Sequence, residues 1–208
     1  MSINVNSNSS REEIINWLTH AIGLLLSCAG LVILINKGSN DHLIAVCVYG
    51  GTLILLYLLS TLYHLIAHIK VKSIFRKLDH IGIFLLIAGT YTPFCLVAVN
   101  DNLGLTILAI VWLLALAGVI FKIFLTGKFE ILSLLIYLSM GWMCIVVIKP
   151  VYDSLPFWSF ILLMIGGLFY SSGVIFYRMS KLKYHHGVWH LFVIAGSASH
   201  FMSILAFV

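Results

Sequence analysis

Two histidines four residues apart, His186 and His190, form the most specific chemical pattern in the sequence. On a helix, residues at this spacing lie on one face and can share a metal ion. A zinc site needs at least one further ligand, and a catalytic zinc site also keeps one position open for water. His64, near the end of another apolar segment, is a candidate for that ligand. Ser60 lies one turn deeper on the same face, where its hydroxyl can hydrogen-bond into the site.

Asp79 is the carboxylate that the sequence places beside these histidines, at the expected start of the third apolar helix. Three neutral imidazoles leave a zinc ion with two positive charges in surroundings of low dielectric constant, and a nearby carboxylate offsets that cost. Asp79 could also orient a water molecule or accept a proton from it. The alternative is a structural role as a favourable charge at a helix N-terminus, worth about 0.3 to 1 kcal/mol.

The chain has nine histidines, and most of them are expected at one membrane level. These are His20, His64, His68, His80, His185, His186 and His190. Histidine is also comfortable at a membrane interface, so some of these residues could simply flank the helices. His68 and His185 compete as ligands by their spacing, and we expect both to face solvent or lipid headgroups. His200 lies about 15 Å along the helix from His190 and cannot share its ion, so we expect it to pack or to hydrogen-bond.

The elements that position these residues are predicted from composition. Of 208 residues, 62% are hydrophobic and only 9% are charged, against roughly 25% charged in a soluble domain. A membrane-spanning helix needs about 20 apolar residues, and seven runs of that length are present. They are Trp17 to Ile35, Leu43 to Ala67, Leu78 to Val99, Leu103 to Phe121, Phe129 to Ile148, Phe157 to Tyr177, and Val188 to Phe207. We therefore expect one all-α domain over residues 1–208, a seven-helix polytopic membrane protein with a short polar tail at residues 1–12.

The orientation of these helices is predicted from the basic residues between them. With connectors assigned alternately to the two sides, ten Lys or Arg residues fall on one side, while Lys37 and Lys149 fall on the other. Short loops with more Lys and Arg stay in the cytoplasm. The N-terminus is therefore expected in the cytoplasm and the C-terminus outside, in the inner or plasma membrane. The segment before the first apolar run lacks the basic region of a cleavable signal, so we expect the first helix to remain in the mature chain.

Several residues inside the spans have expected structural roles. Pro93 removes one helical hydrogen bond and predicts a tolerated kink. Four cysteines lie singly in apolar runs and are expected to be buried thiols. Small residues in the last two helices should permit close packing; they are Gly166, Gly167, Gly173, Gly196, Ser197, Ala198 and Ser199.

Taken together, these motifs resemble those of the bacterial hemolysin III family, within the progestin and adipoQ receptor superfamily of seven-helix membrane proteins. The resemblance spans most of the chain and implies kinship with alkaline ceramidases. It implies a zinc ion held by His64, His186 and His190, with Asp79 and Ser60 close by. The motifs that carry it are Glu13-x-x-Asn16-x-x-Thr19-His20-x-x-Gly23, Ser60-x-x-x-His64, Asp79 followed by GTYTP, and His186-x-x-x-His190 with His200.

The polar residues of the first motif carry no assigned chemistry. For Glu13, Asn16, Thr19 and His20 we expect capping and interfacial packing at the entry to the first helix, because these residue types suit a helix start. The outer loops are too short to capture a protein ligand, and the chain lacks the long N-terminal domain of the hormone-receptor branch. No soluble protein ligand is therefore expected.

Three functions compete at this point. The first is a zinc-dependent, ceramidase-like hydrolase acting on a lipid amide or ester at the inner leaflet, with Asp79 and Ser60 as its catalytic residues. The second is a non-enzymatic protein of membrane homeostasis or sensing whose zinc is structural. The third, a pore-forming cytolysin, lacks a secretion signal and a charged ring along a pore. The basic residues flank the spans and indicate topology, so nucleic acid is not an expected partner. Membrane lipid is the expected one.

Overall fold

The computed structural model describes residues 10–208 and is helical from one end to the other, with no strand in that range. Seven segments are long and apolar enough to cross a membrane, which confirms the predicted class of fold. The elements in chain order are α1 (Ser10–Lys37), η1 (Asn40–His42), α2 (Leu43–Leu65), α3 (Ile69–Pro93), η2 (Phe94–Val99), α4 (Asn102–Leu125), α5 (Glu130–Gly141), η3 (Trp142–Val147), α6 (Ile148–Ser154), α7 (Phe157–Arg178) and α8 (His185–Leu205).

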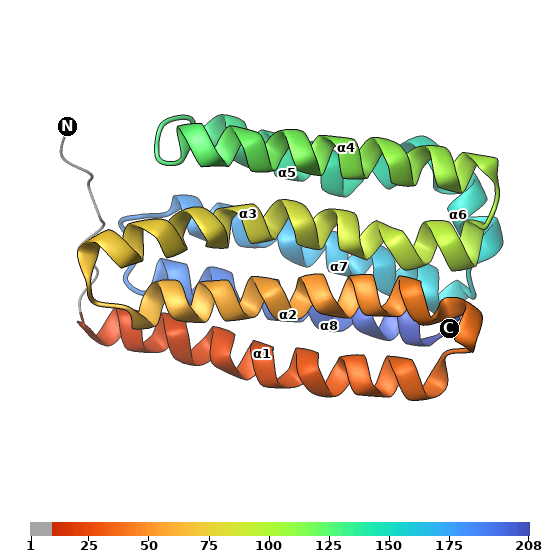
Figure 1. Cartoon of the computed structure of the whole chain (residues 1–208), viewed down its shortest axis with the longest axis horizontal. Coiled ribbons are helices and arrows are strands. Elements are labelled where there is room, and N and C mark those ends of the chain that lie inside the picture. Colours follow the sequence, from red (N-terminus) through yellow and green to blue (C-terminus); the bar gives the residue numbers. More distant parts are fainter. Residues whose placement is uncertain (1–9) are drawn as a thin grey trace.

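The helices run side by side along the long axis of the molecule (Figure 1). In this view α1 lies at one edge and the α4 and α5 pair at the other, with α2, α3, α7 and α8 between them. The last helix, α8, packs against both α7 and α1. This return of the chain brings the start of α8 beside the start of α1 and the end of α2, where the predicted site residues lie.

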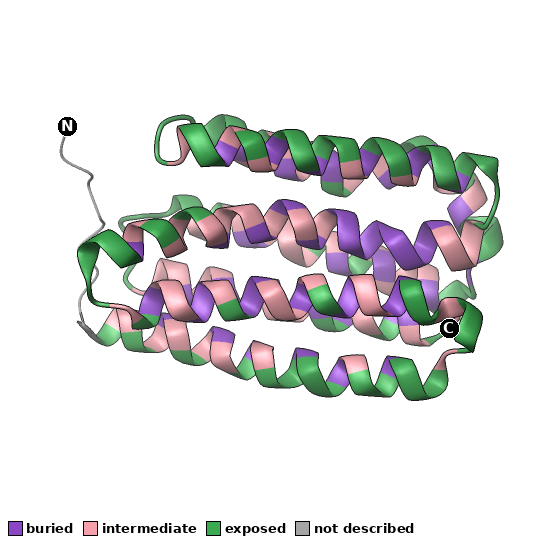
Figure 2. Cartoon of the chain, viewed as in Figure 1, coloured by how far each residue is buried: buried purple, intermediate pink, exposed green. Residues whose placement is uncertain are grey.

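The outward faces of the bundle are apolar, as a lipid environment requires. Leu25 is 72% exposed, Phe124 is 75% exposed and Val146 is 84% exposed. Figure 2 shows this exposed surface on α1 and α4, whereas α3 is buried over much of its length. The buried faces meet in a core of large side chains that includes Tyr49, Tyr57, Phe84 and Met140.

Small residues bring α7 and α8 into close contact, as predicted. A Cβ atom added to Gly166 would lie 2.1 Å from the His200 ring, and one added to Gly196 would lie 2.9 Å from the Tyr170 ring. The close approach lets the His200 Nε2 atom reach the Leu163 carbonyl oxygen at 3.1 Å. His200 therefore has the packing and hydrogen-bonding role expected from the sequence. The four cysteines are free thiols; Cys95 and Cys144 are buried as predicted, whereas Cys47 is half-buried and Cys28 is exposed.

Two predicted helix starts are wrong, and both matter for the site. The third span begins at Ile69, not at Leu78, so Asp79 lies nearly three turns inside α3. The prediction that Asp79 opens this helix, and its alternative role as an N-terminal charge, are therefore wrong. The first helix begins at Ser10 and not at Trp17. Both helices begin with polar and charged residues, which a search for apolar runs of membrane-spanning length does not include.

The helices are irregular at the end of the bundle away from these starts. Pro93 closes α3, and the chain continues as a π-helical segment, η2, which fits the predicted disturbance. The fifth span is interrupted by the 3-10 segment η3. The Tyr91 hydroxyl lies 3.0 Å from the Met140 carbonyl oxygen, and the backbone N–H of Cys144 donates to it at 2.8 Å. These bonds satisfy backbone groups that the irregular turn leaves without helical partners.

Candidate metal centre

Three histidines meet at the junction of α2 and α8. His64 lies in the last turn of α2, and His186 and His190 lie in the first two turns of α8. Their ligand atoms all lie within 4.8 Å of one another, close enough to hold one metal ion. The Nε2 atoms of His64 and His186 are 3.1 Å apart. The pair at four-residue spacing and the histidine from a distant segment thus converge as the sequence indicates.

The hydrogen bonds on the outer side of two rings fix which nitrogen carries the proton. His64 Nδ1 lies 2.8 Å from the Glu13 carboxylate, and His190 Nδ1 lies 3.1 Å from the Asn16 carbonyl oxygen. Carboxylate and carbonyl oxygens only accept, so Nδ1 is the protonated nitrogen in both neutral rings. Their Nε2 lone pairs are therefore directed toward the centre of the cluster. His190 Nε2 is buried and has no hydrogen-bond partner within residues 10–208, which suits a nitrogen that coordinates a metal ion.

Glu13, Asn16 and Thr19 support the ligands from α1, which differs from the capping and interfacial role expected for them. Besides Asn16, the Thr19 hydroxyl lies 3.0 Å from His190 Nδ1. The second Glu13 oxygen pairs with Lys72 Nζ at 3.3 Å. Partners of this kind set the orientation and basicity of metal-ligating imidazoles. The family pattern marked these positions, but the spacing along the chain gave no sign of their partners on α2 and α8.

We expect the Glu13→Gln substitution to weaken metal binding by about 10- to 100-fold, the usual cost of losing an outer partner of a ligand. Glutamine keeps the size of the side chain but removes the charge that holds the Nδ1 proton of His64. The measurement is metal affinity by competition with a chelator of known strength.

Asp41→Asn is the matched control for this substitution, because it removes one carboxylate from the exposed 3-10 turn η1, at the end of the helices away from His64. An affinity equal to that of the wild type in Glu13→Gln would mean that the Glu13 contact does not support the ligand.

His20 is a fourth buried histidine beside the cluster. It is 1% exposed, and its ring stacks on His190 with 3.5 Å between centroids. Neither ring nitrogen has a hydrogen-bond partner in the described part of the chain. His20 does not belong to the set whose ligand atoms converge. The sequence did not indicate this stacking, and His20 is buried against His190 instead of taking the expected capping role.

Asp79 and Ser60 lie next to the histidines, although Asp79 reaches them from inside α3. Asp79 is 3% exposed and Ser60 is completely buried. The Asp79 carboxylate interacts with His64 through their charges, and the Ser60 hydroxyl is its hydrogen-bonding neighbour. The burial places a carboxylate and a hydroxyl beside the ligands.

The competing histidines are separated from the cluster. His68 follows the end of α2 and is exposed, as expected. His185 differs from the expectation, since it is half-buried and lines a pocket next to His186. Neither is in the converging set of ligand atoms.

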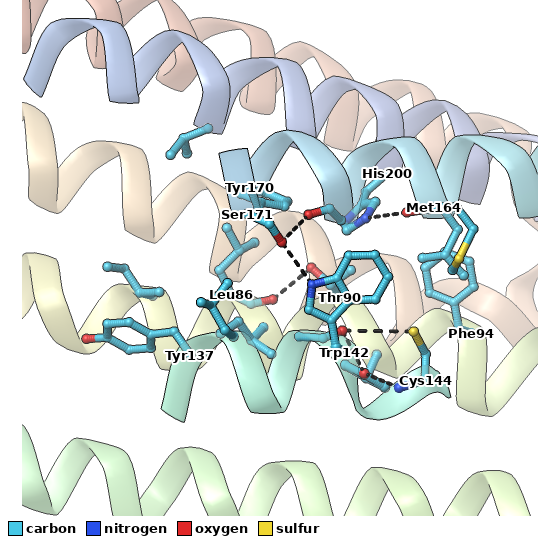
Figure 3. Close-up of a pocket in the computed structure, with 18 of the residues that line it drawn as sticks. Leu86, Thr90, Phe94, Tyr137, Trp142, Cys144, Met164, Tyr170, Ser171 and His200 are labelled. Carbon is cyan, nitrogen blue, oxygen red and sulfur yellow. Dashed lines mark hydrogen bonds between the residues drawn. The ribbon is translucent and has the colours of Figure 1, made fainter. Parts of the chain in front are cut away.

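An internal chamber of about 170 Å³ extends from the histidine cluster along the core. His20 and Asp79 line it near the cluster, and its wall continues along α3, α5, α7 and α8 to Phe94 and Cys144. Figure 3 shows that several polar atoms in this wall are paired with the protein itself; Trp142 Nε1, for example, donates to the Ser171 hydroxyl at 2.8 Å. The chamber is therefore suited to an apolar ligand.

A second pocket, of about 290 Å³, lies where α3, α5, α7 and α8 meet at the histidine end of the bundle. We call it the polar mouth; its lining includes Arg76, Asp79, Glu130, Arg178 and His186. Asp79, Tyr137 and Trp189 line both the mouth and the chamber. The two spaces therefore adjoin beside the cluster of three histidines.

Comparisons with known proteins point to one family. The family model described as haemolysin-III related matches residues 8–201. Hemolysin-3 of Bacillus cereus is 50% identical over 202 residues, covering 95% of this chain and 92% of that protein. The hemolysin-3 homolog of Bacillus subtilis is 49% identical, covering 94% and 93%. The human monocyte to macrophage differentiation factor is 28% identical, covering 93% and 83%.

Proposed function

The chain belongs to the haemolysin-III-related family of multi-pass membrane proteins, and from this premise we propose that it is a zinc protein with a hydrolase-like site for a lipid amide or ester. The convergence of His64, His186 and His190 beside an apolar chamber supports the proposal most strongly. The same cluster would hold the ion, with the buried Asp79 and Ser60 as the catalytic residues.

The donor set favours zinc among the common metal ions. Three imidazoles suit zinc, copper, iron or nickel better than magnesium or calcium, and three protein ligands leave a position open, as in catalytic zinc sites. When bound, zinc supplies Lewis acidity that polarises a carbonyl group and lowers the pKa of water to near neutrality. Metal analysis of the purified protein identifies the ion.

The chain's own residues would bind and orient the lipid and move the proton. The apolar chamber would take part of the hydrocarbon chain, so that an amide or ester carbonyl lies near the cluster. An Asp79 carboxylate oxygen would accept the proton from the attacking water and return it to the leaving group. The Ser60 hydroxyl, beside Asp79, would hydrogen-bond into the same space.

We expect the Asp79→Asn substitution to lower lipid hydrolysis by about 100-fold or more, the usual contribution of a general base, while the metal content stays unchanged. The measurement is release of fatty acid from a broad panel of lipid amides and esters by the purified protein with zinc present.

Asp41→Asn serves again as the exposed control for this experiment. If the wild-type protein releases no fatty acid, the proposal that it is an enzyme is wrong. Full activity in Asp79→Asn would contradict only the catalytic role of Asp79 and not the proposed hydrolase activity.

The site would face the cytoplasmic leaflet of the cell membrane. The structure places Arg11, Arg76, Lys122 and Arg178 at the same end of the bundle as the histidine cluster. That end carries the excess of basic residues, and such ends stay in the cytoplasm. The N-terminus would then be inside and the C-terminus outside.

The second candidate function is a structural zinc site in a protein of membrane homeostasis or sensing. It is favoured by the origin of the ligands, since His64 comes from α2 and the other two come from α8. An ion bound by these residues would join two helices that are far apart in the sequence. Such a site would stabilise the bundle without turnover.

Metal removal is expected to destabilise the protein under either function. Binding at 1,000 times the dissociation constant contributes about 4 kcal/mol, and each kcal/mol shifts Tm by about 2 to 4 °C in a chain of this size. Thermal unfolding in detergent with and without a chelator measures this shift.

Restored zinc should reverse the shift, and His64→Asn should not respond to the chelator at all. An unchanged Tm in the wild type, with metal shown to be removed, would contradict the structural function. Hydrolysis that is lost with the metal would favour the enzyme.

A further inference from the structure

Two arginines, Arg76 and Arg178, line the polar mouth, and one of its two carboxylates, Glu130, is shared with a lysine outside the lining. Glu130 is approached by Arg76 Nη2 at 3.5 Å and by Lys122 Nζ at 3.6 Å. The Lys122 side chain is only 1% exposed, so its charge needs this carboxylate as a partner. One carboxylate therefore serves two cations, which leaves Arg76 incompletely neutralised.

Arg178 adds a second guanidinium group to the same pocket. It is the last residue of α7, it is exposed, and it forms no ion pair with any residue from 10 to 208. Arg76 enters the pocket from α3, a different helix. Two arginines on separate helices that line one pocket are suited to an anion with several oxygens, because guanidinium binds phosphate through paired hydrogen bonds.

The acidic residues of the mouth do not cancel this arrangement. Glu130 is occupied by Arg76 and Lys122, and Asp79 lies at the inner end, where the mouth adjoins the chamber. Of the two arginines in the lining, Arg178 is thus the one without an ion-pair partner among residues 10–208. A bound metal ion would add positive charge at the inner end.

The adjoining chamber indicates what kind of molecule carries the anion. Asp79, Tyr137 and Trp189 line both spaces, so a ligand can occupy the two together. The chamber is apolar and, at about 170 Å³, smaller than the roughly 300 to 1,000 Å³ of drug-sized sites. It would take part of one hydrocarbon chain.

We propose that the polar mouth binds the phosphate group of a single-chain amphiphile between Arg76 and Arg178, with its hydrocarbon chain in the chamber. This binding rests on the proposed function only in that a lipid enters the site. It requires neither hydrolysis nor a metal ion.

The test compares two lipids that differ only in the phosphate. Binding of lysophosphatidic acid and of the monoacylglycerol with the same acyl chain is measured by calorimetry, on purified full-length protein in detergent. Metal is removed first, so that the arginines and not the ion are tested. Wild-type protein should bind the phosphate-bearing lipid at least about tenfold more tightly, since hydrogen bonds between charged groups contribute that much.

Arg178→Gln and Arg76→Gln should each reduce this preference severalfold. Arg178→Gln keeps the test valid if the other variant folds poorly, because Arg178 is exposed and unpaired within the described residues. Lys77→Gln and Lys181→Gln are the matched controls. Each removes one exposed positive charge next to the mouth without lining it, and each should keep the wild-type preference.

Two outcomes would overturn the proposal: equal binding of the two lipids by the wild type, or equal losses in the arginine and lysine variants. Competition by millimolar inorganic phosphate would support recognition of the free phosphate group. If inorganic phosphate does not compete and the preference for the phosphate-bearing lipid remains, the site recognises the phosphate as part of a lipid. A protein that hydrolyses nothing but keeps the arginine-dependent preference would refute the hydrolase and leave this site standing.

Discussion

Replacing His190 with asparagine is expected to abolish stoichiometric metal binding and any lipid hydrolysis. The loss should exceed the roughly 10- to 100-fold effect of removing an outer partner, because the substitution deletes one of the three proposed ligands. Asparagine is chosen because its amide nitrogen lies near the position of Nδ1. It can keep the hydrogen bond to the Asn16 carbonyl oxygen while removing Nε2.

The matched control for this substitution is His200→Asn. His200 lies ten residues further along α8, is also buried, and contacts Leu163 instead of the cluster. It should lower stability but leave one metal ion per chain. Metal analysis by mass spectrometry, with circular dichroism as a check on folding, decides the result. A folded His190→Asn protein that retains a full equivalent of metal would eliminate His190 as a ligand.

The second large effect is expected from one added methyl group in the interface between α7 and α8. In Gly166→Ala the new Cβ would lie 2.1 Å from a carbon atom of the His200 ring. That ring is held by its bond to Leu163 and by the neighbouring Tyr170 ring, so it cannot move freely. Overpacking of this kind costs about 1 to 3 kcal/mol, and more where the neighbours cannot move.

Gly51→Ala is the control for the interface substitution, since its added Cβ would meet no atom within 4 Å. Alanine there should be neutral or slightly stabilising, because glycine is the poorer helix former. Thermal unfolding in the same detergent compares the two variants. Equal Tm values for both variants would show that α7 and α8 can move apart without a loss of stability.

The seven spans were predictable because each must bury its backbone polar groups in about 20 apolar residues, which leaves a direct trace in composition. The helix ends were not predictable in this way. In α3 the turns from Ile69 to Leu78 contain charged residues, one of which, Lys72, is buried against Glu13. These additional turns of α3 therefore contact another helix through a charged residue, and a search for apolar runs does not detect such a contact.

The same distinction applies to the site. The four-residue spacing of His186 and His190 is a local property of one helix, so it could be recognised from the sequence. The contact between Glu13 and His64 joins residues 51 positions apart and depends on how α1 is rotated against α2. The chamber and the mouth also arise from packing among several helices. No single segment encodes them.

Residues of α1 contact the histidines of α2 and α8, and this arrangement has a consequence for biosynthesis. During translation Glu13 enters the membrane with the first helix and His64 with the second, but His186 and His190 follow only with the last. No nascent chain can therefore close the centre before all seven spans are inserted. Metal capture in the cell would mark completed assembly, and chains arrested before α8 would be distinguished by their inability to retain the ion.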